Sequence, residues 1–211
     1  MNKLQITNCT AIKEQTNMYE VKFSDGNEYI FNYDEIIKYA LYEGSNSIAY
    51  DYNNLIFCTN VDRAFEKSLS FVLLRARTFA EVRKKLTEME FEALVIEKVI
   101  EKLFEYKYID DFDYCVRYIR TKNKLKYVSI KTLEFELGQK GVDNDMIINC
   151  IEECEIDEYS NAREILRKKS KNIDCIDNKI KQRLERLLYS KGFGFDVIKV
   201  VMEERILNDE D

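Results

Sequence analysis

Cysteine is the residue of this chain with the widest chemical repertoire, because thiolates bind metals, act as nucleophiles and form disulfides. The chain has six cysteines: Cys9, Cys58, Cys115, Cys150, Cys154 and Cys175. Cys150 and Cys154 are four residues apart and share a helix face, but no second cysteine pair or histidine completes a zinc-like set. We interpret the cysteines as small apolar residues in a reducing compartment.

Histidine is absent from the sequence, which removes Ser-His-Asp and Cys-His catalysis and every metal site that needs imidazole. Asp110-Asp111 could form a metal pair, but residues that end one unit and cap the next helix need no metal. The close pair Gly192 and Gly194 lies between predicted helices, so it is not a phosphate-binding loop. An enzyme that uses carboxylates alone is the disfavoured alternative. We expect no catalysis, no cofactor and no metal.

Basic side chains are the remaining candidates for a binding site. The net charge of −6 argues against simple nonspecific DNA binding, yet residues 159–205 carry seven acids and twelve bases. Residues 116–133 form the longest basic stretch without an acid. We predict a discontinuous basic stripe that contacts phosphates or an acidic protein surface, the alternative being a solvated face balanced by nearby acids. Its members are Arg75, Arg77, Lys84, Lys85, Arg117, Arg120, Lys124, Lys126, Lys131, Arg167, Lys168 and Lys169.

Aromatic residues crowd the same region and could stack on nucleobases. They are Tyr106, Tyr108, Phe112, Tyr114, Tyr118 and Tyr127. Packing between structural units is the competing interpretation, and we favour it for Tyr108, Phe112 and Cys115.

A 51-residue period sets the elements that must position these side chains. Leu86, Leu137 and Leu188 stand 51 residues apart. Three more apolar series keep the same offset: Val82, Leu133 and Leu184; Phe91, Val142 and Phe193; and Ile96, Ile147 and Ile198. Several series in one phase indicate a helical unit copied three times and stacked to share a core.

Capping signals divide each unit into three helices. Thr78-Phe79-Ala80-Glu81 fits a capping box, and Ser129 stands 51 residues after Thr78. The second helix of each unit ends near Glu90, Gly141 or Gly192, the type of position that favours glycine. The sequence therefore predicts a mainly α fold, in which tandem three-helix repeats form an elongated curved array. We assign the repeats to 62–111, 112–158 and 159–211, the last with an acidic tail at Asp209-Glu210-Asp211.

Residues 1–61 differ from the repeats and form a predicted β-rich extension with one short helix. Alternating residues 19–23, the turn Asp25-Gly26 and residues 28–31 indicate a β-hairpin. Residues 3–12 are a candidate third strand, and residues 34–41 a short helix ending near Gly44. We interpret residues 45–60 as a connector that contains one short element. Because no apolar run is long enough to span a membrane and no signal peptide opens the chain, we expect a cytoplasmic protein.

Three segments of the chain resemble the RecX family. Residues 75–86 look like its Arg-x-Arg-Ser-x-x-Glu-Leu segment, and residues 108–142 like its Tyr-Leu-Asn/Asp-Asp entry followed by Glu-Leu-x-x-Lys-Gly-Ile. Residues 188–198 look like its closing Leu-x-x-Lys-Gly-Phe segment. The extension resembles that of Gram-positive-type members. Met89-Glu90 departs from the usual Lys-Gly, and Lys124-Leu125-Lys126 sits where another Lys-Gly is common.

The resemblance implies a regulator of the recombinase RecA, with roles in DNA repair, recombination and the SOS response. It would bind along a RecA filament on single-stranded DNA and limit filament growth, ATPase and coprotease activities. Contact with single-stranded DNA would be indirect or weak, and we expect a monomer. The alternative function is a helical nucleic-acid-binding module that acts independently of RecA.

Overall fold

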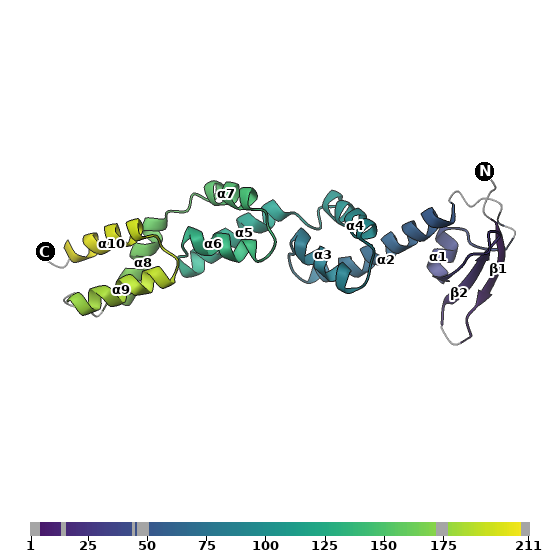
Figure 1. Ribbon diagram of the computed structural model, residues 1–211, viewed down its shortest axis with the longest axis horizontal. Coiled ribbons are helices and arrows are strands. Elements are labelled where there is room, and N and C mark those ends of the chain that lie inside the picture. Colours follow the sequence, from purple (N-terminus) through teal and green to yellow (C-terminus); the bar gives the residue numbers. More distant parts are fainter. Residues whose placement is uncertain (1–4, 14–15, 44, 46–50, 172–176, 208–211) are drawn as a thin grey trace. The chain divides into compact units, whose positions relative to one another are not determined.

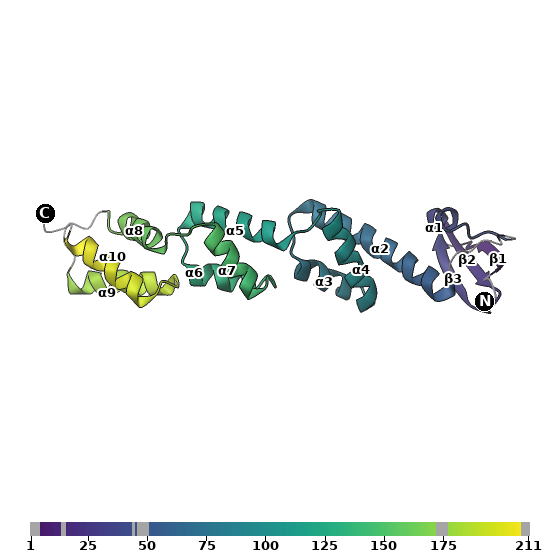
Figure 2. The ribbon, with the colours of Figure 1, turned by 90° about the horizontal axis from the view of Figure 1, so that it is seen from above.

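The computed structural model describes residues 5–13, 16–43, 45, 51–171 and 177–207. The described residues fall into two compact units, one within 1–68 and 86–99 and the other within 69–85 and 100–211. Cys175 and the predicted acidic tail lie outside the described residues, as does Gly44. Figures 1 and 2 show a small sheet at the N-terminal end of the chain and helices elsewhere, which is the predicted fold class.

The first unit contains an antiparallel sheet in the order β1-β2-β3, formed by β1 (Ile6–Ala11), β2 (Met18–Phe23) and β3 (Glu28–Asn32). This confirms the hairpin and the third strand. Val21 pairs with Cys9 on one side and Tyr29 on the other. Helix α1 (Tyr33–Lys38) follows β3 directly, because Asn32 and Glu35 form a capping box. The core beneath the sheet contains Ile6, Val21, Phe23, Phe31, Ile36, Leu41 and Leu55.

Helix α2 (Tyr52–Leu74) begins ten residues before the position at which the helical pattern becomes clear in the sequence. The predicted connector with a short element is therefore wrong for residues 52–60, which belong to one helix of 23 residues, and residues 46–50 lie outside the described residues. Asn53 and Asn54 disfavour a helix interior, but Asp51 accepts a hydrogen bond from the Asn54 N–H at 2.8 Å and caps the first turn. Leu55 is fully buried in the sheet core. Tertiary burial thus overrides a weak local propensity.

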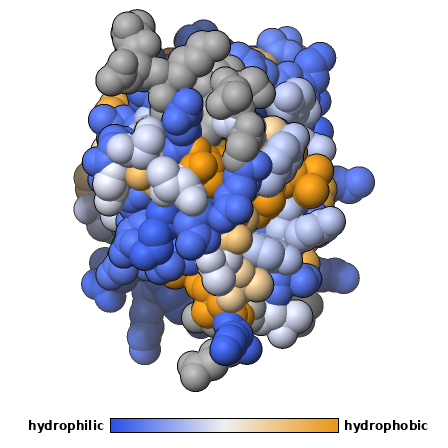
Figure 3. All heavy atoms as spheres, turned by 90° about the vertical axis from the view of Figure 1, so that its right-hand side faces the viewer, coloured by the Kyte–Doolittle hydropathy of each residue, from blue (hydrophilic) through white to orange (hydrophobic). Residues whose placement is uncertain are grey.

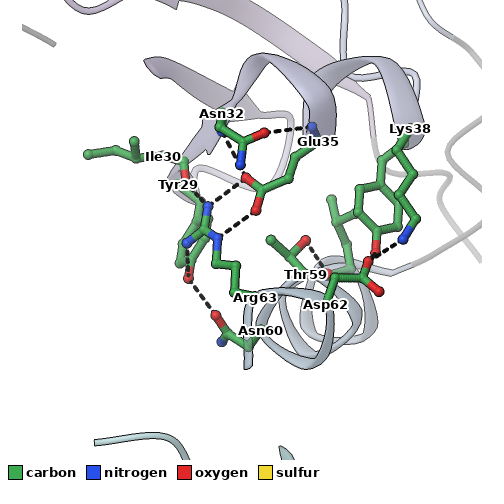
Figure 4. A network of polar contacts seen from close by, with 11 residues as sticks. Tyr29, Ile30, Asn32, Glu35, Lys38, Thr59, Asn60, Asp62 and Arg63 are labelled. Atoms are coloured by element: carbon green, nitrogen blue, oxygen red, sulfur yellow. Dashed lines mark hydrogen bonds and ion pairs between the residues drawn. The ribbon is translucent and has the colours of Figure 1, made fainter. Parts of the chain in front are cut away.

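An ion-pair network joins α2 to the end of the sheet (Figure 4). Arg63 donates from Nε and Nη2 to the two carboxylate oxygens of Glu35, each at 2.6 Å. Its Nη2 also donates to the Ile30 carbonyl at 2.9 Å. The Glu35 side chain is 8% exposed and the Arg63 side chain 29%. The hydrogen bonds to Glu35 raise the pKa of Arg63, and a guanidinium is charged at every ordinary pH even without such a rise.

The first unit also has apolar residues at its surface, outside its core. Ile30, Tyr33, Ile37 and Tyr42 are each more than a third exposed. Figure 3 views this end of the molecule and shows apolar patches at the surface among hydrophilic residues.

The helices after α2 follow the predicted three-helix pattern. The first repeat continues with α3 (Phe79–Glu88) and α4 (Ala93–Glu105). The second comprises α5 (Asp111–Lys126), α6 (Ile130–Gly138) and α7 (Asn144–Glu153). The third comprises α8 (Glu158–Lys169), α9 (Asn178–Ser190) and α10 (Phe195–Leu207). In both ribbon views α5, α6 and α7 form one group and α8, α9 and α10 another.

The 51-residue period marks core positions. Leu86, Leu137 and Leu188 are at most 1% exposed, and the series of Val82 and Ile96 are also buried at all three places. Phe91 is the one exception among the twelve, being only partly buried. The second and third repeats each have a separate apolar core around these residues.

The predicted role of the cysteines as core residues holds for two of the five that the structure describes. Cys115 and Cys150 are buried and free, and burial raises the pKa of both thiols, whereas Cys9, Cys58 and Cys154 are only partly buried. The aromatic prediction is partly wrong. Tyr114 and Tyr118 pack against the core of the second repeat, whereas Tyr108 and Phe112 are 44% and 45% exposed. The aromatic character of these residues does not by itself tell which rings are buried and which are exposed.

Candidate partner-binding surface and the joints between repeats

A capping hydroxyl forms the joint between the first and second repeats. Thr78 caps α3, and its Oγ1 accepts from the Glu81 N–H at 3.1 Å while Glu81 accepts from the Thr78 N–H at 3.2 Å. The predicted capping box is therefore confirmed. The same Oγ1 donates to the carbonyl of Lys140 at 2.7 Å. The residue that begins a helix in one repeat thus holds the end of the corresponding helix in the next.

The joint between the second and third repeats has the same chemistry. Ser129 caps α6, and its Oγ donates to the carbonyl of Lys191 at 2.8 Å. Thr132 adds a second hydroxyl, which donates to the same carbonyl at 2.9 Å. Thr78 to Lys140 and Ser129 to Lys191 are both 62 residues apart. Because donor and acceptor recur with the period, the two junctions are built alike.

A carboxylate completes each joint, and it is buried at the first joint and partly buried at the second. Asp111, the first residue of α5, accepts from the Phe79 N–H at 2.8 Å. Glu158, the first residue of α8, accepts from the Ile130 N–H at 3.0 Å. Burial raises the pKa of both carboxyl groups, and the hydrogen bonds from the backbone oppose that rise. The neighbouring Asp110 caps α5 by accepting from the Asp113 N–H, as predicted.

The joints explain why glycine follows lysine in the second and third repeats. Gly141 and Gly192 have φ of +75° and +85°, which favours glycine. A Cβ added at Gly141 would lie 2.3 Å from the Ala80 Cβ, and one at Gly192 would lie 2.7 Å from the Ser129 Oγ. Conformation and close approach both exclude a side chain.

The first repeat has Met89-Glu90 in place of Lys-Gly, and no described hydroxyl donates to the Met89 carbonyl as in the two joints. Glu90 has φ of +63°, so the backbone takes the same turn, and its side chain is exposed. The third repeat departs at the opposite end. Ile180 stands 51 residues after Ser129, and α9 begins earlier with Asp177 as its cap. Neither departure breaks the repeat; each marks a position at which one half of the joint is not used.

The predicted stripe residues gather near the ends of the first helix of each repeat. Arg75 and Arg77 follow α2, Lys124 and Lys126 end α5, and Arg167, Lys168 and Lys169 end α8. The others lie on the same helices or on the next: Arg117, Arg120, Lys131, Lys84 and Lys85. Cations at a helix C-terminus also interact favourably with the helix dipole. The basic residues at these helix ends can therefore stabilise the helices without any binding partner.

Several stripe residues are held by internal partners. Arg77 is 13% exposed and lies over the Phe71 ring at 3.8 Å, and Arg75 pairs with Glu81 at 3.1 Å. Arg117 pairs with Asp113, and Arg167 with Glu164. Lys168 lies 4.4 Å above the ring of Tyr127 from the preceding repeat, so it joins two repeats.

Other stripe residues remain available to a partner. Lys124, Lys126, Lys131 and Lys169 are exposed, and within the described part of the chain none of them forms an ion pair. They are the members best suited to contact phosphate or carboxylate groups.

Sequence reasoning missed a cluster of exposed aromatics at the second joint. Tyr189 and Phe195 stack with their centroids 5.3 Å apart, and Phe135 lies along the same groove. Residue type alone does not separate an exposed aromatic ring from a buried one, so only their exposure in the structure distinguishes them.

Comparison with known proteins gives a consistent result. The family models described as the first and third three-helix domains of RecX match residues 64–103 and 155–202. The regulatory protein RecX of Bacillus cytotoxicus is 31% identical over 196 residues, which cover 91% of this chain and 72% of the relative. The chain belongs to the RecX family. The regulatory protein RecX of Bacillus subtilis is 29% identical over 211 residues, which cover 98% of this chain and 79% of that relative.

Solved RecX structures share the fold. A crystal structure of regulatory protein RecX superposes with a TM-score of 0.66 at 20% identity, covering 95% of this chain and 99% of the other. RecX from Lactobacillus salivarius gives a TM-score of 0.62 at 20% identity, covering 69% of this chain and 96% of the other. Among the described helices, none combines the length and apolar character needed to cross a membrane.

Proposed function

We propose that this RecX-family chain is a non-enzymatic regulator that binds along a RecA filament on single-stranded DNA, in the cytoplasm, as a monomer. It limits filament growth and, with it, ATP turnover and coprotease activity. The relatives named regulatory protein RecX support the regulatory role. The family resemblance supplies RecA as the partner.

The repetition of one joint carries this proposal. Thr78 with Lys140 and Ser129 with Lys191 connect successive repeats through the same atoms. Successive repeats therefore offer similar surfaces at a regular interval. A filament also offers similar surfaces at regular intervals, so modest contacts combine at high effective concentration if the spacings match.

Exposed lysines supply the proposed contacts. Lys124 and Lys126 end the first helix of the second repeat, and Lys169 ends that of the third. An ammonium without an internal ion pair can pair with an incoming acidic group without first breaking another contact. At the rim of an interface it loses little of its hydration when the pair forms. Such contacts strengthen association mainly through faster encounter, and they weaken as salt increases.

The decisive experiment measures RecA ATPase on single-stranded DNA while the full chain is added below stoichiometric amounts. We expect turnover to fall and filaments to shorten. Unchanged turnover together with unchanged filament length would refute the proposal.

A charge-reversal pair tests the lysines. Lys124→Glu with Lys126→Glu should weaken inhibition by at least about tenfold, because two attractive contacts become repulsive. Lys13→Glu with Lys107→Glu changes the net charge equally at exposed positions outside the stripe. If the two pairs behave alike, net charge rather than the stripe governs binding.

A further inference from the structure

Three aromatic rings lie at the surface where the second and third repeats meet. Phe195 is 76% exposed, Phe135 66% and Tyr189 60%. Tyr189 and Phe195 stack with an angle of 29° between their planes. Large aromatic side chains normally bury most of their surface, so three together at this exposure need a reason other than the core.

Two grooves flank the stacked pair, which therefore forms a ridge between them. One groove, of about 440 Å³, lies between α9 and α10 and has Ile198 and Met202 among its lining. The other, of about 480 Å³, runs along the joint and includes Phe135 and Lys131. Tyr189 and Phe195 line both grooves.

The charge of the grooves is mainly positive. The α9–α10 groove is lined by Lys181, Arg186 and Lys199 together with Glu185 and Glu203. The joint groove contains Lys131 and no acidic residue, and hydroxyls of Thr132 and Ser190 add polar groups. The linings hold four cations and two carboxylates, and the Asp196 carboxylate lies beside Gly194 of the joint groove, so four cations face three carboxylates and an anionic ligand is still favoured.

The ridge is not part of the repeated architecture. The positions 51 residues before Tyr189 and Phe195 hold Gly138 and Asn144, and the position 51 before Phe135 holds Lys84. The joint between the first two repeats therefore forms without these rings. Their presence at the second joint is not required to connect the repeats.

We propose that the ridge of Tyr189 and Phe195, with Phe135, binds single-stranded nucleic acid by base stacking. Exposed flat rings offer planes to unpaired bases, and lysines on either side meet the phosphates between them. An acidic protein segment would satisfy the cations, but it would not need two stacked rings that expose most of their surface. This site shares only Lys131 with the basic stripe. Its test does not require RecA, so it stands or falls independently of the proposed function.

The absence of tryptophan makes the first test direct. Phe195→Trp places a single tryptophan on the ridge, and Leu94→Trp places one at a 74% exposed site in the first repeat. Oligothymidylate of about 15 nucleotides should quench the first by stacking and leave the second nearly unchanged. Equal quenching of both, or of neither, overturns the proposal.

A second test separates stacking from simple apolar contact. Binding of fluorescein-labelled oligothymidylate is followed by anisotropy at fixed salt. Phe195→Leu keeps apolar volume but removes the ring, and it should weaken binding roughly 5- to 150-fold. Tyr189→Phe keeps the ring and should bind like the parent chain, as should Leu94→Ala.

A protein-docking role would give a different pattern. Phe195→Leu would then leave oligonucleotide affinity unchanged while weakening association with a RecA filament, and that outcome would overturn the proposal. Circular dichroism of each variant shows whether folding is intact, and the exposed position of Phe195 makes misfolding an unexpected result.

Discussion

Gly141→Ala tests the joint between the first and second repeats, at a residue where backbone conformation and a close neighbour both exclude a side chain. Alanine at φ of +75° costs about 1–2 kcal/mol, partly offset by about 0.4–1 kcal/mol from the stiffer unfolded chain. The new Cβ would lie 2.3 Å from the Ala80 Cβ, more than 1 Å inside a normal carbon contact. Relieving such overpacking typically costs about 1–3 kcal/mol. The expected loss of unfolding free energy is therefore about 1–4.5 kcal/mol.

Urea denaturation followed by circular dichroism measures this loss. With a slope of about 2 kcal/mol/M, the midpoint should fall by about 0.5–2 M. Gly138→Ala is the matched control, since it lies three residues earlier in a helix with no atom within 4 Å of the added Cβ. Alanine there should leave stability unchanged or raise it slightly. If Gly141→Ala unfolded within about 0.5 kcal/mol of that control, the close approach we describe would not exist in solution.

Three further outcomes follow from the same structure. Glu90→Gly should be neutral or stabilise the first repeat by up to about 1 kcal/mol, because glycine adopts the positive φ at this position without strain. Thermal denaturation measures the change. Arg63→Ala should cost about 3 kcal/mol by stranding the buried Glu35 carboxylate, whereas Lys38→Ala, at a surface pair, should cost under about 1 kcal/mol in the same urea assay. Because the folded pKa of Asp111 is raised, the wild-type chain loses stability as pH increases from the unfolded value through the folded one; Asp111→Asn should remove that loss, and identical pH profiles of the two chains would contradict the assignment.

Local patterns in the sequence predicted much of the repeat architecture. The four apolar series mark positions that are nearly all buried, because a core face imposes apolar character wherever the helix turns inward. Thr78 and Ser129 were identifiable as caps because a hydroxyl before a helix has a known local role. These features depend on neighbours within a few residues.

Features that depend on distant residues could not be found in the same way. The hydroxyls of Thr78 and Ser129 meet backbone carbonyls 62 residues away, and a carbonyl carries no residue type to recognise. Helix α2 extends into a polar segment because Leu55 packs under the sheet. The exposed Phe195 has the same composition signal as a buried phenylalanine, so only the fold reveals it. The stripe stays a prediction for its exposed lysines.

The joint also determines how such a chain could grow. Only the middle repeat carries both halves, with Ser129 on one side and Lys140-Gly141 on the other. A tandem duplication of the middle repeat would supply matching halves at each new boundary, and a four-repeat descendant would be chemically consistent. Copies of the first or third repeat would set Glu90 or Ile180 at a boundary that needs glycine or a hydroxyl. The array can therefore be lengthened by duplicating its middle repeat, but not by duplicating the first or the third repeat.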